Sequence, residues 1–205
     1  MYICGRCKVH ACDLENPEFP KVCPCRDEEI VQKSLEIANE PDNKELGIAS
    51  SYARGEDNKR HTRIEETMNV LKHLGVKHVG FAFCTGLSKE AEVFQKILEH
   101  NGFEVDSVIC RCGNLPREAI GIPDDRKVNP GHFETMCNPI GQALFLEKCK
   151  TEFNIMMGLC VGHDALFFKY THVPCTVIAV KDKVLAHNPL GAIYNIETYY
   201  KEMLK

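Results

Sequence analysis

The placement of the cysteines limits most strongly how this chain can fold. Five of the twelve cysteines lie within the first 25 residues, together with three prolines and no apolar periodicity. A segment of this kind has too few apolar side chains to form a core, so a bound metal is the natural source of its stability. The sequence therefore predicts a small metal-binding knot in residues 1–26, followed by a larger α/β domain in residues 27–205.

The expected redox state of the thiols follows from the start of the chain. The N-terminus reaches a charged residue at Arg6 and lacks the apolar stretch of a secretory signal, which predicts a cytoplasmic protein. Because the cytosol keeps thiols reduced, disulfides are not expected. Cysteine usage of this kind indicates metal binding or catalysis.

The composition and net charge of the chain argue against two classes of partner, nucleic acids and anionic membranes. A hydrophobic fraction of 44%, a charged fraction of 26% and a net charge of −4 are ordinary for a globular domain, and they favour neither nucleic acid nor an anionic membrane as partner. No apolar run approaches the roughly 18 residues that a membrane span needs. We expect a small molecule or a metal as the ligand.

The knot contains a pair of cysteines with metal-ligand spacing. Cys4 and Cys7 form a C-x2-C pair, and Cys12 and Cys23 could complete four sulfur ligands. Such a closed set is typical of structural zinc and of many iron–sulfur clusters, and the spacing does not decide between them. Cys25 and His10 remain as spare ligands.

The rest of the sequence predicts an α/β fold. Helical periodicity fills residues 27–40 and continues in a second helix around residues 46–49, and after Gly75 buried strands alternate with helices. We expect an open, mostly parallel, Rossmann-like sheet of about five strands, with helices on both faces. The loop 113–136 is long enough to suggest a functional role. The further expected helices are 59–74, 88–101, 139–151, 163–170 and 197–204. The expected strands are 76–83, 103–110, 154–159 and 175–180, with 183–186 as a hairpin strand.

A second group of cysteines falls where expected strands end or a helix begins. In doubly wound sheets, ligands bind beyond the carboxyl ends of the strands, and neighbouring strands are only about 4.8 Å apart. We therefore predict that four cysteines share one cofactor site, in which Cys112 is an alternative ligand to Cys110. The four members are Cys84, Cys110, Cys137 and Cys160.

The competing interpretation is that a free cysteine packs as a small hydrophobic side chain, because free cysteine is among the most buried residue types. We expect that role for Cys149, in a helix, and for Cys175, at the start of a strand.

The catalytic candidates follow the third strand. Cys160 leads into a turn and helix that carry His163 and Asp164. His163 could ligate a metal or move a proton, whereas Asp164 could orient His163 or cap the helix. His187 follows another strand and is a weaker candidate for the same cleft.

These residues resemble a known family. The arrangement Cys4-x2-Cys7-x4-Cys12 with Cys23-Pro24 is followed by the blocks 83–87 (FCTGL), 136–140 (MCNPI), 158–164 (GLCVGHD) and 187–189 (HNP). Over nearly the whole chain the pattern is similar to a family of uncharacterised archaeal and bacterial proteins described as metal-binding. The resemblance implies metal binding, Cys23 as the fourth ligand of the knot with Cys25 dispensable, and Cys110 rather than Cys112 in the core site.

Two functions are therefore expected, and a third is kept open. The first is a metal-binding protein, with zinc or an iron–sulfur cluster, that carries out redox or sulfur-transfer chemistry at the strand-end cysteines. The alternative is a zinc-stabilised, non-enzymatic protein that senses, stores or carries a metal or a small anionic ligand. The third is an adaptor whose knot docks a protein partner.

Overall fold

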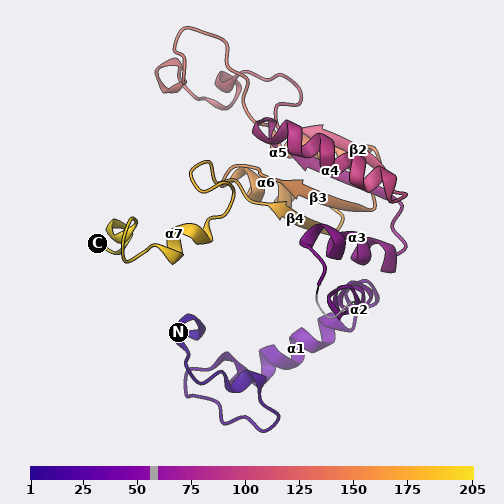
Figure 1. The fold of residues 1–205 in the computed structure, drawn as a ribbon, viewed down its shortest axis with the longest axis vertical. Coiled ribbons are helices and arrows are strands. Elements are labelled where there is room, and N and C mark those ends of the chain that lie inside the picture. The colour runs from indigo at the N-terminus through magenta and orange to yellow at the C-terminus, as the bar shows by residue number, and fades with distance from the viewer. Residues whose placement is uncertain (56–59) are drawn as a thin grey trace.

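Four parallel strands form one open sheet at the centre of the protein (Figure 1), as seen in a computed structural model that describes residues 1–55 and 60–205. The strand order is β2-β1-β3-β4. Each strand is five or six residues long. The strands are β1 (His78–Phe83), β2 (Glu104–Ile109), β3 (Phe153–Met157) and β4 (Cys175–Ala179).

The predicted α/β class and the parallel, Rossmann-like sheet are confirmed, but the expected fifth strand is wrong. Residues 183–186 form a turn instead. The Asp182 carboxylate accepts hydrogen bonds from the amides of Val184 and Leu185 at 2.9 and 2.8 Å. Ala186 also has a φ of 50°, which an extended strand does not allow. The local turn chemistry of an aspartate therefore replaces the hairpin.

Helices cover both faces of the sheet (Figure 1). α3 and α4 contribute side chains to the apolar cluster on one face, whereas α5 and α6 contribute to the cluster on the other. The helices are α1 (Glu28–Ala38), α2 (Pro41–Gly55), α3 (Arg63–His73), α4 (Ser88–His100), α5 (Pro139–Lys148), α6 (His163–Tyr170) and α7 (Leu190–Tyr194).

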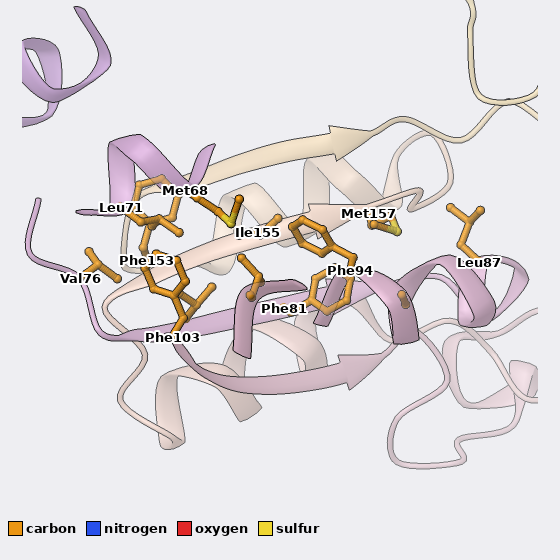
Figure 2. Close-up of a cluster of buried hydrophobic side chains, with 13 residues drawn as sticks. Met68, Leu71, Val76, Phe81, Leu87, Phe94, Phe103, Phe153, Ile155 and Met157 are labelled. Carbon is orange, nitrogen blue, oxygen red and sulfur yellow. The ribbon is translucent and has the colours of Figure 1, made fainter. Parts of the chain in front are cut away.

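The first apolar cluster lies between the sheet and α3 and α4 (Figure 2). Phe81 of β1 is fully buried and meets Phe94 of α4 edge to face, with ring centroids 5.1 Å apart. Leu71 and Ile155 are also fully buried. Burial of one such side chain contributes roughly 1.5–3 kcal/mol, so this cluster is a main source of stability.

The second cluster lies under α5 and α6 and includes two of the cysteines predicted to bind a cofactor. Cys84 and Cys110 are buried there beside Leu146 and Phe167, both of which are fully buried. The core site is thus built directly onto the hydrophobic packing of this face.

Local sequence signals explain where several helices begin and end. Thr62 and Glu65 form a capping box at the start of α3, and Gly75, with a φ of 69°, follows its end. The predicted helix 59–74 is therefore found in shorter form, and Lys59 lies outside the described residues.

The predicted terminal helix over residues 197–204 is wrong for most of its length. The chain forms turns over residues 195–200 and then a 3₁₀ helix at Lys201–Leu204. The apolar side chains of this segment, among them Tyr199 and Leu204, are exposed. A helix this short gains most of its stability from packing an apolar face, and none is packed here.

The N-terminal segment extends away from the sheet together with α1 (Figure 1). Residues 1–26 contain three single-turn 3₁₀ helices, at Cys4–Arg6, Ala11–Asp13 and Pro24–Arg26. Ala11 is the only buried residue among these 26. Among the described residues, no helix is both long and apolar enough to cross a membrane.

Candidate functional site

The strand order places a switch point between β1 and β3. β2 lies on one side of β1, whereas β3 and β4 lie on the other. In open α/β sheets, ligands bind at the carboxyl ends of the two strands that flank such a point. Cys84 directly follows β1, and Cys160 follows β3 by three residues. The topology therefore directs two of the predicted site cysteines to the expected binding position.

Cys84 forms hydrogen bonds at this position through its amide and through its sulfur. Its amide donates to the carbonyl of Met157, at the end of β3, at 3.1 Å. Its Sγ accepts a hydrogen bond from the Gly86 amide at 3.4 Å and another from the Lys181 ammonium at 3.0 Å. A backbone amide and a cation are therefore both directed at the Cys84 sulfur.

Cys110 and Cys137 are brought together by the backbone around Asn138. The Asn138 amide donates to the carbonyl of Cys110 at 2.7 Å, and the Asn138 side chain caps α5 by accepting from the Gly141 amide at 2.8 Å. The Cys110 Sγ accepts from the Thr85 amide at 3.3 Å. The cap of α5 thus sets Cys137 against the buried thiol of Cys110.

The two thiols of this pair titrate in opposite directions. The hydrogen bond from the Cys110 thiol lowers the pKa of Cys137 to about 7, and the Arg111 guanidinium also lowers it. The same hydrogen bond, with burial, raises the pKa of Cys110 well above its ordinary value. Cys137 is therefore the thiolate of the pair near neutral pH, and Cys110 is its proton donor.

Cys160 interacts electrostatically with the other three cysteines of the predicted core site. Burial and the neighbouring Cys84 raise its pKa, whereas Lys181 and Lys183 lower it. Cys84 and Cys160 in turn act on Cys137. The structure thus brings all four predicted core cysteines into one interacting group, which we call the core cysteine site.

Cys112 lies beside the core cysteine site, but its thiol points to a backbone carbonyl rather than to another cysteine. Its thiol donates to the carbonyl of Asn138 at 3.6 Å, and burial raises its pKa. Cys110, rather than Cys112, is the cysteine that hydrogen-bonds to Cys137.

Two residues of the site were missed by sequence reasoning. Lys181 follows β4 and approaches Cys84 from 97 positions away in the sequence. Gln142 of α5 is fully buried and donates to the carbonyls of Phe83 and Val108 at 3.2 and 2.7 Å, which joins α5 to the ends of β1 and β2. A glutamine within the apolar run 139–146 was the one sequence signal that could have identified Gln142.

The catalytic candidates lie at the start of α6. The Asp164 carboxylate accepts hydrogen bonds from the amides of Gly162 and Ala165 at 2.9 and 2.8 Å, so it serves the helix terminus. His163 is half-buried, and its amide donates to the Cys160 carbonyl at 2.9 Å. His187 is bonded instead to the backbone of the segment that carries Lys181, at Val180 and Asp182.

The cysteines of the knot also gather. Hydrogen bonding to Cys23, followed by burial and by electrostatic interaction with Cys12 and Cys4, raises the pKa of Cys25. Cys4, Cys7 and Cys23 line one cavity of about 180 Å³. The knot therefore draws together all four predicted ligands and also Cys25, which the family resemblance had treated as dispensable.

Amide donors also act on Cys7. Hydrogen bonds from the backbone amides of His10 and Val9 lower the pKa of its thiol. His10 adopts a left-handed backbone conformation, with a φ of 51°, at the start of the second 3₁₀ helix. The turn that follows Cys7 is thus shaped to support a thiolate.

The two cysteines expected to pack in the core differ from each other. Burial raises the pKa of Cys175 to about 12, in agreement with a packed thiol. Cys149 is exposed at the C-terminus of α5, so the prediction that it packs in the core is wrong. Its thiol hydrogen-bonds to the Asp106 carboxylate of β2 rather than packing among apolar side chains.

The chemistry of the donors fits a thiophilic metal in both groups, because thiolates are the ligands that zinc and iron–sulfur clusters prefer. Within residues 1–55 and 60–205, however, no three His, Cys, Asp or Glu side chains are already arranged around a common point that could hold a metal ion.

Comparisons with known proteins agree with this picture of an uncharacterised family. A family described as "Protein of unknown function (DUF1847)" matches residues 23–178, a range that includes the whole core cysteine site. The chain is 41% identical to the uncharacterized protein MJ0455 of Methanocaldococcus jannaschii over 177 residues, which cover 86% of this chain and 89% of that protein. No solved structure matches the chain.

Proposed function

The chain belongs to the DUF1847 family of proteins of unknown function, and we propose that its core cysteine site binds a zinc ion or an iron–sulfur cluster that serves redox or sulfur-transfer chemistry. The resemblance to an uncharacterised family found from the sequence motifs is confirmed by both comparisons, whereas the metal binding that it implied stays a prediction. The proposed ligands are Cys84, Cys110, Cys137 and Cys160.

The observation that carries the proposal is the set of donors that point at sulfur. A purely structural cluster of thiols does not need a cation, yet the Lys181 ammonium lies 3.0 Å from the Cys84 Sγ. The amides of Thr85 and Gly86 also donate to sulfurs, at 3.3 and 3.4 Å. Hydrogen bonds to ligand sulfurs tune the reduction potential of iron–sulfur clusters and stabilise thiolates at metal sites.

The residues of the chain have separate roles in this proposal. The four thiolates would hold the metal or cluster, and a bound cluster would supply electrons or sulfur, whereas bound zinc, with all four positions taken by thiolates, would hold the sulfurs in place. Lys181 offsets the negative charge that several thiolates bring to one place. Asn138 fixes Cys137 against Cys110, and Gln142 holds α5 onto the two strand ends from which Cys84 and Cys110 start.

A second candidate function rests on the knot. Residues 1–26 bury a single side chain, yet Cys4, Cys12, Cys23 and Cys25 are drawn together there. Small segments of this kind are commonly held by structural zinc. In this alternative, zinc in the knot only stabilises a non-enzymatic protein that binds, senses or carries a metal.

The location and partners belong to the same proposal. We place the protein in the cytoplasm, where thiols stay reduced and remain available to metal. A net charge of −4 favours neither nucleic acid nor an anionic membrane as its partner.

The test is anaerobic purification followed by analysis of zinc, iron and acid-labile sulfide, with a visible absorption spectrum. The wild-type chain is compared with the double variant Cys84→Ser/Cys160→Ser and with Cys149→Ser, which alters an exposed cysteine outside both groups. We expect the double variant to lose one metal or cluster per chain and Cys149→Ser to lose none.

Two results would decide against the proposal. Unchanged metal content in the double variant would leave the core cysteines as packing residues. A single zinc per chain that is lost only when Cys4 and Cys7 are replaced by serine would favour the zinc-stabilised, non-enzymatic alternative.

A further inference from the structure

The long loop between β2 and α5, residues 110–138, protrudes beyond the sheet (Figure 1) and is held by charges rather than by apolar packing. Lys127 has a side chain only 3% exposed, and its ammonium bonds to the Asp124 carboxylate at 2.9 Å, to the Glu118 carboxylate and to the His132 carbonyl at 2.9 Å. The pKa of Lys127 is raised, first by its hydrogen bond to Glu118. Since a buried ammonium is costly unless it is fully paired, this arrangement fixes the loop in one conformation.

A second connection closes the base of the loop. Arg117 pairs with Glu134 at 3.0 Å, and its amide donates to the Glu134 carbonyl at 3.0 Å. The same carboxylate accepts from the Asn129 amide at 2.6 Å. An isolated bridge pairs Pro116 with Thr135, next to this ion pair. The loop is therefore an ordered lobe with its own internal bonds.

A cavity of about 340 Å³ is lined by residues of this lobe itself. Such a volume falls in the lower part of the range, about 300–1,000 Å³, that small-molecule sites occupy. Phe133 and Val128 contribute apolar side chains to its wall and are themselves exposed to solvent. Arg111, two residues after β2, lines the cavity as well.

The charges around the cavity leave one cation uncompensated. Glu134 is already paired with Arg117 and bonded to Asn129, so its charge is neutralised within the lobe. The Arg111 side chain has no hydrogen bond or ion pair to any of the described residues, and it is exposed. Arg111 interacts electrostatically with the thiol of Cys137. Since Arg111 lines the cavity and directly follows Cys110 in the chain, the cavity adjoins the core cysteine site.

We infer that this cavity binds a small organic oxyanion, a carboxylate, phosphonate or sulfonate with an apolar part, and presents it to Cys137. The Arg111 guanidinium takes the oxyanion, because its planar fork matches two oxygens at once. Phe133 and Val128 pack on the apolar part. The inference rests on the proposed function in one respect, since it treats this anion as the substrate of the core cysteines.

The test uses benzoate as the probe, with inorganic phosphate as a probe that lacks an apolar part. Binding to the full chain is followed by amide chemical shifts in a titration, together with the rate at which iodoacetamide modifies Cys137 after the metal has been removed. The variants are Arg111→Gln, Arg111→Lys and the control Arg126→Gln, which removes another exposed arginine of the same loop that does not line the cavity.

We expect benzoate to bind saturably, more tightly than phosphate, and to slow the alkylation of Cys137. Arg111→Gln should weaken binding by about tenfold or more, as expected for the loss of a charge-assisted hydrogen-bond pair. Arg111→Lys should recover only part of the affinity, and Arg126→Gln should stay within about twofold of the wild type.

The inference is overturned if benzoate does not saturate the wild type, or if Arg111→Gln and Arg126→Gln weaken it equally. It is also overturned if bound benzoate leaves the alkylation of Cys137 unchanged. Metal content separates this inference from the proposed function, because Arg111→Gln should retain the wild-type metal and a protein without core metal could still bind benzoate.

Discussion

The knot and the core cysteine site are both rich in cysteine, but they are built in opposite ways. The core cysteines lie next to a sheet whose central residues, such as Phe81 and Ile155, are fully buried. The knot, residues 1–26, buries only Ala11 and contains no strand. In the body of the protein, apolar packing places the cysteines, whereas the knot has almost no such packing, and we propose that its cysteines supply the stability by binding metal.

The difference extends to the surroundings of the sulfurs. In the core site, donors approach the thiols from three separate segments, through Lys181, Thr85 and the Cys110 thiol. In the knot, the shift of Cys25 comes first from a neighbouring thiol two residues away, and it is upward. In the knot, the backbone amides of His10 and Val9 lower the pKa of Cys7, whereas in the core site a cation, Lys181, also lies against sulfur. This cation is the reason that we assign the chemistry to the core.

Removal of metal should produce the largest difference between the two regions. Structural zinc contributes about 10–16 kcal/mol to small metal-held segments, so treatment with a strong chelator should unfold the knot and leave the sheet intact. Hydrogen exchange followed by mass spectrometry should show residues 1–26 losing all protection, while β1 and β3 keep theirs. Equal loss of protection in β1 and β3 would mean that metal, rather than packing, holds the body together.

Apolar truncation should give the reverse pattern. Phe81→Ala removes a fully buried ring from the first cluster and should lower the free energy of unfolding by about 3–5 kcal/mol. Leu14→Ala in the knot alters a side chain that is 60% exposed and should change it by less than about 0.5 kcal/mol. Urea unfolding followed by circular dichroism measures both. Comparable losses from the two variants would contradict the proposed division of stability.

The smallest expected effect concerns the acidity of Cys137 in metal-free protein. The hydrogen bond from Cys110 is the main cause of its pKa of about 7. Cys110→Ala should therefore raise the midpoint of its alkylation profile toward the ordinary thiol value of about 8.5. Between these two pH values the wild-type sulfur is a thiolate and reacts, whereas the variant sulfur is still a thiol.

The profile is measured from alkylation rates by mass spectrometry between pH 5 and 10, chosen as roughly two units around the two expected midpoints. Cys112→Ala is the matched control, because Cys112 adjoins Cys110 in sequence but is not among the causes of the Cys137 shift. A midpoint that stays near 7 in Cys110→Ala would show that Arg111 or another group sets it.

Much of the fold followed from local patterns in the sequence. The change from helical periodicity to buried runs after Gly75 predicted β1, α4 and β2 to within two residues at each end. The helix His163–Tyr170 was predicted with its observed ends. These elements are set by side-chain periodicity and by glycines that end helices, which are properties that neighbouring residues determine together.

The features that were missed depend on contacts between distant segments or on turn chemistry. Lys181 reaches Cys84 because β4 lies beside β3 at the edge of the sheet. The order of the strands cannot be predicted from local sequence patterns. The expected strand 183–186 alternates like a strand, but the Asp182 carboxylate binds two of its amides. The convergence of the four core cysteines could be predicted because the ends of parallel strands share one edge.

The most direct test of the central assignment is extended X-ray absorption fine structure at the edge of whichever metal the anaerobically purified full chain contains, compared with Cys137→Ser. We predict four sulfur ligands at about 2.3 Å in the wild type, as for zinc or iron bound by cysteine thiolates, and a lower mean sulfur number in the variant. A first shell of nitrogen and oxygen atoms, or a sulfur number that Cys137→Ser leaves unchanged, would contradict the assignment of the core cysteines as ligands.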